Sequence, residues 1–360
     1  MQLNFFEELG KFNPNLREHE SIDWKWSFKD YPEKNGLKVF SCFACGGGST
    51  MGYKLAGCEV LGDLEIDPRV NNLYIKNHNP KYNFLMDIRD FNKLEDLPEE
   101  LYHLDILDGS PPCTTFSMAG KREDSWGVKK KFREGQTEQT LDDLSFYFID
   151  TAKKLQPKVV IMENVEGLLL GEAWSYVQRI YKEFAEAGYI VNHYLLKGEA
   201  LGVPQKRHRV FFVGVRQDLN FDFYKLDMNF NYKPVYFGEV RSKKGKEIKG
   251  AVTKEKLREL KPGDKSIGDI SIRLNGKNTG FNDTINWDND IASTLRVSSN
   301  AIRACDKKYL SKEDVISIST FPTDYDFINQ SPNYVCGMSV PPLMIKRLIN
   351  RIIDTGIFNI

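Results

Sequence analysis

The sequence predicts an α/β protein built on a doubly wound, mostly parallel β-sheet. Between residues 37 and 216, apolar β-rich segments alternate with segments of helical periodicity, an order that places helices on both faces of a parallel sheet. Several apolar segments end in an acid or lead into a glycine- or proline-containing turn. Ligands of such sheets bind beyond the carboxyl ends of the strands, so these turns are where we expect a functional site.

The predicted elements follow one another at short spacing. We expect strands at residues 37–43, 58–67, 104–109, 157–164, 189–198 and 209–216, and helices at 50–57, 68–78, 141–156 and 173–188. Pro68 suits the first turn of its helix and Gly188 the end of the last one. A final helix is expected to begin at Pro341 and Pro342. Residues 217–290 are polar and rich in Asn, Lys, Asp and Gly, which predicts a smaller, irregular region.

Composition narrows the class of protein. The 360 residues include 50 Lys and Arg and 50 Asp and Glu, so the formal net charge is zero. A nucleic-acid partner stays compatible with this balance, because local runs at 121–122, 129–133, 206–209 and 241–250 are basic. No apolar run reaches the roughly 18 residues of a membrane span. The first residues lack the features of a secretory signal, so we expect a cytoplasmic protein.

The six cysteines do not predict a metal centre. Cys42 and Cys45 have a metal-like spacing, but no second pair or histidine cluster accompanies them. We therefore expect no metal and reduced thiols, of which one can be chemically special.

A glycine loop follows the first predicted strand. Residues 43–49 read FACGGGS, and glycines there let the backbone approach a ligand closely. Alone, the loop is equally typical of an ordinary strand-to-helix turn. Glu65 ends the next strand about twenty residues on, where an acid can hydrogen-bond ribose hydroxyls. Asp87, in MDIRD, falls near the end of the strand that we expect next along the chain, before residues 104–109. The set predicts a nucleoside-containing ligand, while the spacing does not fit a phosphate-binding loop for ATP hydrolysis.

Cys113 lies in the stretch DGSPPCTTFS, on a loop that leaves the carboxyl end of a predicted strand. The two prolines stiffen the backbone before it. Lys121 and Arg122 follow closely and favour a thiolate. This position is more typical of a nucleophile than of a buried structural thiol.

Two further motifs end or begin buried strands. Glu163, in MENVEG, ends an apolar strand, and an unpaired carboxylate buried there is costly. The stretch QKRHR (205–209) precedes another apolar strand and predicts Arg207 and Arg209 on one strand face, directed toward a cleft.

In this order, the motifs resemble those of the cytosine-C5 DNA methyltransferase family, of the bacterial modification type. FACGGG resembles its cofactor loop, SPPC its nucleophile loop, ENV its catalytic Glu motif, and QKRHR its QxRxR motif. GMSVPP (337–342) resembles the closing GNSVPP, and the likeness spans 37–216 and 291–357. Two departures are that Cys45 stands in place of the loop's first glycine and Met338 in place of the closing Asn.

The resemblance implies an S-adenosylmethionine-dependent methyltransferase fold and assigns roles to residues. Cys113 would attack C6 of a flipped cytosine, Glu163 would bind the base at N3 and the amine, and Arg207 and Arg209 would orient the target. Cofactor contacts are implied for Phe43, Ala44, Cys45, Gly46, Gly47, Gly48, Glu65, Ile66, Asp87, Ile88, Pro112, Ser339 and Val340. DNA contacts are implied for Ser117, Lys121, Arg122, Lys129, Lys130 and Lys131.

The resemblance also implies a domain organisation and partners. We expect an N-terminal extension at 1–36, a catalytic and cofactor-binding domain at 37–216 and 291–360, and a target-recognition region at 217–290. We expect a monomer whose partner is double-stranded DNA. The resemblance is also compatible with a cognate restriction endonuclease in the same cell.

Three alternatives stay open. A tRNA cytosine-C5 methyltransferase of the same fold would share the catalytic motifs, although its typical Cys-Phe-Thr tripeptide does not occur here. A catalytically inactive DNA-binding relative would have no need of Cys113, Glu163 and the two arginines together. A nicotinamide dehydrogenase would share the glycine loop and Glu65, but it gives SPPC and QKRHR no role.

Overall fold

The computed structural model describes residues 16–19, 23–112, 143–278, 280, 283–297 and 300–359. The chain forms two compact units, each with its own β-sheet. The large-sheet unit comprises residues 32–196, 208–228 and 346–360. The small-sheet unit comprises residues 197–207, 229–345 and the described residues before 32.

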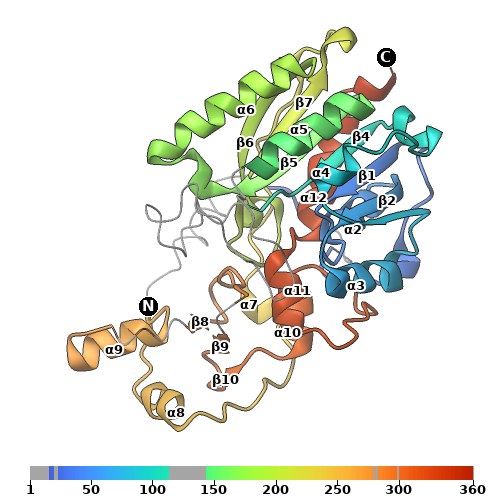
Figure 1. The fold of residues 1–360 in the computed structure, drawn as a ribbon. Coiled ribbons are helices and arrows are strands. Elements are labelled where there is room, and N and C mark those ends of the chain that lie inside the picture. Colours follow the sequence, from blue (N-terminus) through green and yellow to red (C-terminus); the bar gives the residue numbers. More distant parts are fainter. Residues whose placement is uncertain are drawn as a thin grey trace. The chain divides into compact units, whose positions relative to one another are not determined.

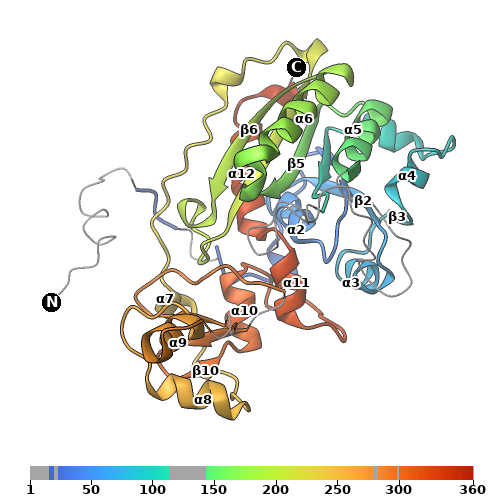
Figure 2. The ribbon, with the colours of Figure 1, turned by 60° about the vertical axis from the view of Figure 1, so that its left-hand side comes forward.

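The large-sheet unit is built on a seven-stranded sheet with the order β3-β2-β1-β4-β5-β7-β6 (Figures 1 and 2). Its strands are β1 (Lys38–Cys42), β2 (Glu59–Glu65), β3 (Tyr82–Leu85), β4 (Ile106–Gly109), β5 (Val159–Val165), β6 (Tyr189–Lys197) and β7 (His208–Arg216). The strands from β3 to β5 pair in parallel, whereas β7 pairs antiparallel to β5. The mostly parallel α/β sheet predicted from the sequence is thereby confirmed.

Helices cover this sheet on both faces. They are α2 (Gly48–Leu55), α3 (Pro68–His78), α4 (Ile88–Phe91), α5 (Leu144–Leu155), α6 (Trp174–Glu186) and α12 (Pro342–Ile353), the last of which begins in the small-sheet unit. Figure 1 shows α5 and α6 side by side over one face, above a core that includes the fully buried Phe40, Leu107 and Phe148. Gly109 of β4 permits this packing, because a Cβ atom there would lie 2.3 Å from Cε2 of Phe148.

The opposite face of the sheet carries a row of polar side chains. The strand register aligns Asn83, Asp63, Ser41 and Asp108 across β3, β2, β1 and β4, and we call these four residues the polar row. Ser41 Oγ donates to Oδ2 of Asp108 at 2.7 Å, and Asn83 Nδ2 donates to Oδ1 of Asp63 at 2.9 Å. Paired residues of neighbouring strands point to the same face, so the row forms one polar strip, in which Asp63, Ser41 and Asp108 are buried.

Helices α2 and α3 bind the polar row directly. Tyr53 of α2 donates its hydroxyl to Oδ1 of Asp108 at 3.0 Å. Asn71 of α3 accepts a hydrogen bond of 2.7 Å from Nδ2 of Asn83. Because burial disfavours a charged carboxylate, the pKa of Asp108 is raised to about 7. The first two helices are therefore joined to the sheet by hydrogen bonds as well as by apolar contact.

The ends of α3 follow from its sequence. Asp67 accepts a hydrogen bond of 2.9 Å from the backbone nitrogen of Arg69, and Pro68 occupies the first turn. The helix stops before Asn79, whose φ of 44° is left-handed. These signals place His78 at the last helical position, next to the glycine loop.

The small-sheet unit contains a three-stranded sheet with the order β10-β9-β8. Its strands are β8 (Thr284–Asn286), β9 (Ala301–Arg303) and β10 (Lys308–Tyr309), and its helices include α7 (Phe237–Val240), α8 (Ala251–Arg258), α9 (Ile267–Asn275), α10 (Lys312–Ile318) and α11 (Pro332–Met338). Arg303 of β9 is buried and pairs with the buried Asp314 of α10 at 3.2 Å. The assignment of residues 217–290 to a target-recognition region stays a prediction.

Residues 23–31, part of the predicted N-terminal extension, belong to the small-sheet unit. Trp26 is 3% exposed and donates its Nε1 hydrogen to the carbonyl of Thr320 at 2.8 Å. The backbone nitrogen of Phe28 donates to Asp324, and that of Thr323 donates to the carbonyl of Trp26. This stretch is therefore part of the folded core of its unit.

Across the described part of the chain, no helix has both the length and the apolar character needed to cross a membrane.

Candidate active site

The glycine loop leaves β1 and leads into α2 through an unusual backbone path. Phe43, Cys45 and Gly47 all have positive φ, at 56°, 49° and 81°. Left-handed backbone is costly for residues with a Cβ atom, so two of these three positions store strain. The cysteine in the family's first glycine position thus keeps a glycine-like conformation.

Glu65, at the end of β2, holds this loop in place. Its Oε2 accepts a hydrogen bond of 2.9 Å from the backbone nitrogen of Cys45. Its Oε1 accepts hydrogen bonds of 2.9 Å from the backbone nitrogens of Ile66 and Asp67. Burial raises the pKa of Glu65, against the effect of these three bonds. The carboxylate therefore orders the loop as well as being a candidate ribose ligand.

Three further predicted cofactor residues, Ile66, Asp87 and Ile88, follow the carboxyl ends of β2 and β3. Ile66 is 37% exposed directly after β2, which leaves an apolar side chain open to a ligand. Asp87 begins α4 and forms an ion pair with Arg89, with Oδ2 and Nη2 2.6 Å apart. Ile88 is buried beside it. Because Asp87 is already paired, a ligand there would share or displace Arg89.

Glu163 and Arg209 form an ion pair. Arg209 Nε lies 2.7 Å from Oε1 of Glu163, and both side chains are largely buried. The antiparallel register pairs Glu163 with Phe211 and Val165 with Arg209, so the two charged residues are diagonal neighbours on one face. The partner that the buried carboxylate of Glu163 required is therefore Arg209.

Arg207 and the closing motif belong to the small-sheet unit. Strand β7 begins at His208, so Arg207 precedes the strand and the prediction that it lies on it is wrong. Its guanidinium is buried and donates to the carbonyl of Gly337 at 3.1 Å. Ser339 donates its hydroxyl to the carbonyl of Val335 at 2.8 Å, and Val340 is buried. The QKRHR and GMSVPP motifs are thus joined through Arg207.

Cys113 lies outside the described residues, and so do the predicted DNA contacts Ser117, Lys121, Arg122, Lys129, Lys130 and Lys131. Pro112 is the last residue described before that segment and is half-buried. The strand that leads to it, β4, carries the buried Asp108 of the polar row.

Two residues were not singled out from the sequence: His78, which contacts the glycine loop, and Asp108, which binds Tyr53 of α2. The spacing of Val70, Tyr74 and His78 was the available signal for the first, since residues four apart share a helix face. For Asp108, the available signal was its position two residues after the apolar Ile106 in one strand. Residues two apart share a face of the sheet, so this spacing places an acid on a buried face.

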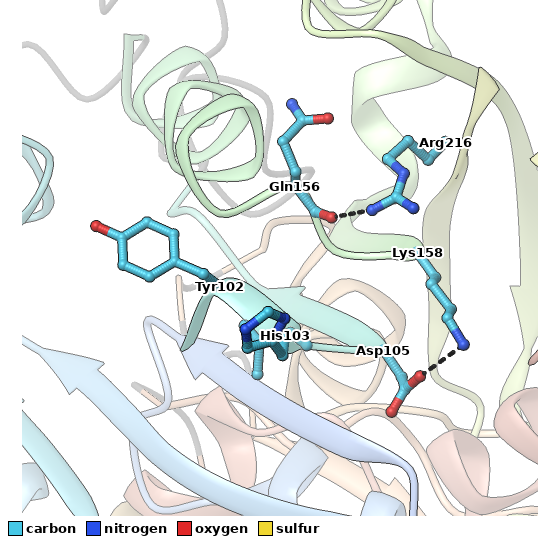
Figure 3. Close-up of a pocket in the computed structure, with 7 residues that line it drawn as sticks. Tyr102, His103, Asp105, Gln156, Lys158 and Arg216 are labelled. Carbon is cyan, nitrogen blue, oxygen red and sulfur yellow. Dashed lines mark hydrogen bonds and ion pairs between the residues drawn. The ribbon is translucent and has the colours of Figure 1, made fainter. Parts of the chain in front are cut away.

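A pocket of about 280 Å³ lies at the opposite end of the large sheet, where the parallel strands begin (Figure 3). Its lining includes Asp105, which precedes β4, Lys158, which precedes β5, and Arg216, which ends the antiparallel β7. Figure 3 shows Lys158 directed at Asp105, and their charged atoms are 3.3 Å apart. Ligands of parallel sheets bind at the carboxyl ends, so this pocket at the amino ends is not the candidate active site.

Comparison with known proteins shows which family the chain resembles. A family model described as C-5 cytosine-specific DNA methylase matches residues 37–354. The type II methyltransferase M.FnuDI of Fusobacterium nucleatum is 37% identical over 184 residues, which cover 51% of this chain and 48% of that protein. M.NgoPII of Neisseria gonorrhoeae is 33% identical over 189 residues, covering 52% and 51%. The matched segment therefore spans about half the length of these relatives.

Solved structures share the fold at low sequence identity. A protein described as a DNA modification methyltransferase encoded within an E. coli prophage is 18% identical with a TM-score of 0.65, covering 89% of this chain and 99% of that one. A DNMT2 mutant of Spodoptera frugiperda is 17% identical with a TM-score of 0.60, covering 88% and 100%. Since the family model matches most of its length, the chain belongs to the C-5 cytosine-specific DNA methylase family.

Proposed function

We propose that the protein is a sequence-specific DNA cytosine-C5 methyltransferase that uses S-adenosylmethionine. The observation that carries the proposal is the Glu163–Arg209 pair at the carboxyl end of β5, in the same unit as the glycine loop. A buried acid with a cationic neighbour can bind a polar base edge and stabilise charge that develops on it. Family membership supplies the reaction class.

The cofactor fits the residues of the large-sheet unit. Gly47 has no room for a side chain, Ile66 is exposed, and Glu65 binds the backbone nitrogens of Cys45 and Ile66. We propose that the backbone of Gly46–Gly48 holds the methionine portion, Glu65 the ribose hydroxyls, and Phe43 and Ile66 the adenine. When bound, S-adenosylmethionine supplies an electrophilic methyl group. Ala44, Cys45, Asp87, Ile88 and Pro112 complete the proposed cofactor set of this unit. Ser339 and Val340 stay proposed cofactor contacts on the resemblance of the closing motif alone.

The side chains of the protein activate the cytosine to receive the methyl group. In the proposed reaction, the thiolate of Cys113 adds to C6 of cytosine, which makes C5 nucleophilic. Glu163 binds N3 and the exocyclic amine and stabilises the ring as its charge changes. Arg209 keeps Glu163 oriented. Arg207, which is bonded to Gly337 of the closing motif, orients the target cytosine in this proposal. Loss of the C5 proton and departure of the thiolate then free the product base.

The proposed substrate is double-stranded DNA with one cytosine flipped out of the stack. Flipping costs a few kcal/mol, which contacts in the pocket offset. The basic residues after Cys113 would bind phosphates, because such contacts need only a local basic face. We further propose a monomer that acts in the cytoplasm, with or without a cognate restriction endonuclease.

The experiment uses the full chain and three variants. Labelled methyl transfer to duplex DNA and to tRNA is measured for the wild type, Cys113→Ser, Glu163→Gln and the exposed control Glu186→Gln. We expect transfer to DNA by the wild type and the control, none by Cys113→Ser, and a loss of about 10²-fold to 10⁴-fold for Glu163→Gln. Bisulfite sequencing of DNA from expressing cells gives the target sequence.

The possible outcomes separate the alternatives. Robust transfer by Cys113→Ser would refute the nucleophile assignment. Transfer to tRNA alone would favour the tRNA enzyme, and cofactor-independent DNA binding without transfer would favour an inactive relative.

A further inference from the structure

His78, the last residue of α3, lies directly against the glycine loop. Its Nε2 is 3.2 Å from the carbonyl oxygen of Gly46. A Cβ atom on Gly47 would lie 2.0 Å from Nε2 and 2.4 Å from Cδ2 of the same ring. The imidazole thus fills the space that a side chain at position 47 would need, and it binds the carbonyl of the preceding residue.

The chemistry of the contact fixes the state of the ring. A carbonyl oxygen only accepts hydrogen bonds, so Nε2 must carry the hydrogen. Burial, with the nearby charge of Lys54, lowers the pKa of His78 to about 3, so the ring is neutral at physiological pH. A neutral ring with its hydrogen on Nε2 is a fixed donor to the loop.

Neighbouring residues hold the ring in this position. The ring of Tyr74 packs edge-on against it, with centroids 4.7 Å apart, and the Tyr74 hydroxyl lies 2.9 Å from Oγ1 of Thr50 in α2. Lys54 Nζ donates to the carbonyl of His78 at 3.2 Å. Residues of both flanking helices therefore fix the histidine, so its contact with the loop is specific and not incidental.

We propose that His78 is a positioning residue for cofactor binding, which holds Gly46 and Gly47 in the conformation that receives S-adenosylmethionine. The inference rests on the proposed function. The residue does not touch the reacting atoms, so its loss acts on cofactor affinity and not on the chemical step. The left-handed Gly47 directly precedes α2 as its N-cap, and the contact therefore fixes the point where the loop becomes helix.

The test is calorimetric binding of S-adenosylmethionine to the full chain. His78→Leu fills the space without a donor, whereas the amide of His78→Gln can donate to the same carbonyl. We expect at least a tenfold loss of affinity for His78→Leu and a loss below threefold for His78→Gln. In steady-state methyl transfer, KM for the cofactor should rise in His78→Leu by a similar factor while kcat stays within twofold.

A control on the same helix separates this role from stability. Asn71→Ala removes the hydrogen bond to Asn83 of the polar row without touching the loop, so it should lower the melting temperature and leave cofactor affinity unchanged. If the wild type binds the cofactor and His78→Leu binds it equally well, or if Asn71→Ala loses as much affinity as His78→Leu, the inference is refuted. If the wild type itself does not bind, the proposed function fails instead.

A double-mutant cycle probes the contact itself. Gly47→Ala alone should weaken binding at least tenfold but leave it measurable, because its methyl group would collide with the ring. Combined with His78→Ala, which removes the ring, Gly47→Ala should cost less affinity than it does in the wild type. An equal loss in both backgrounds contradicts direct contact between residues 47 and 78.

Discussion

At the scale of single residues, the glycine loop is strained at a position that the sequence had marked as unusual. Cys45 stands where the resemblance implies a glycine, its φ is 49°, and Glu65 binds its backbone nitrogen. A residue with a Cβ atom in this conformation costs about 1–3 kcal/mol.

Cys45→Gly should therefore raise stability. Relief of strain outweighs the greater freedom of glycine in the unfolded chain, with an expected gain of up to about 1 kcal/mol in thermal unfolding. Ala44→Gly is the matched control, since Ala44 has no positive φ and should lose stability. A lower melting temperature for Cys45→Gly would contradict the strain.

The sequence predicted the need of Glu163 for a partner but not the way in which Arg209 meets it. Burial of an acid follows from an apolar strand, and so the requirement for a cation follows from sequence alone. The diagonal contact depends on the antiparallel register of β5 and β7, a property of two strands that neither sequence carries by itself. His78 stayed unassigned for the same reason, because its contact lies in another segment.

At the scale of elements, most strands and helices of the large-sheet unit were predicted to within a few residues, whereas β3 was given no bounds and the short α4 was not predicted. Apolar strands such as β5 and caps such as Asp67 before Pro68 are local signals. The polar row is different, because it arises only when four strands align Asn83, Asp63, Ser41 and Asp108. This alignment was not predicted.

Asp108→Asn should change how stability depends on pH. The folded pKa of Asp108 is about 7 against an ordinary 3.8, so between these values the unfolded chain releases a proton that the folded chain keeps. The free energy of unfolding therefore falls as pH rises through this window and levels off above it. Asparagine has no such proton, so the melting temperature of Asp108→Asn relative to wild type should rise from about pH 5 to about pH 8.

Asp218→Asn serves as the control for this pH effect. Its carboxylate is 62% exposed, so the substitution should show no comparable gain at the higher pH. A constant difference between Asp108→Asn and the wild type across the range would count against protonation of the polar row.

At the scale of the whole molecule, the chain is divided between its two units in an interleaved way. It passes from one unit to the other after residues 31, 196, 207, 228 and 345. The N-terminal stretch that includes Trp26 belongs with residues far along the chain, such as Thr320. The sequence predicts an extension separate from the domain there, because local patterns carry no information on such distant contacts.

Trp26→Ala should strongly destabilise the small-sheet unit. It removes a buried indole and the hydrogen bond to Thr320, and losses of this kind cost about 3–5 kcal/mol. Denaturant unfolding measures the effect, with the exposed neighbour Lys25→Ala expected within about 0.5 kcal/mol of wild type. An unchanged midpoint for Trp26→Ala would show that this segment adds nothing to the unit.

The strand order has a consequence for biosynthesis. β7 lies between β5 and β6 in the sheet but leaves the ribosome after both. While residues 198–207 are being translated, β5, with its apolar sequence VVIMENV, has one edge without its final neighbour. Unpaired apolar edges are templates for aggregation. Translation that stalls within the QKRHR stretch thus leaves a nascent chain in which this edge of β5 is unpaired. Chaperones then have a defined interval in which to bind and protect the edge.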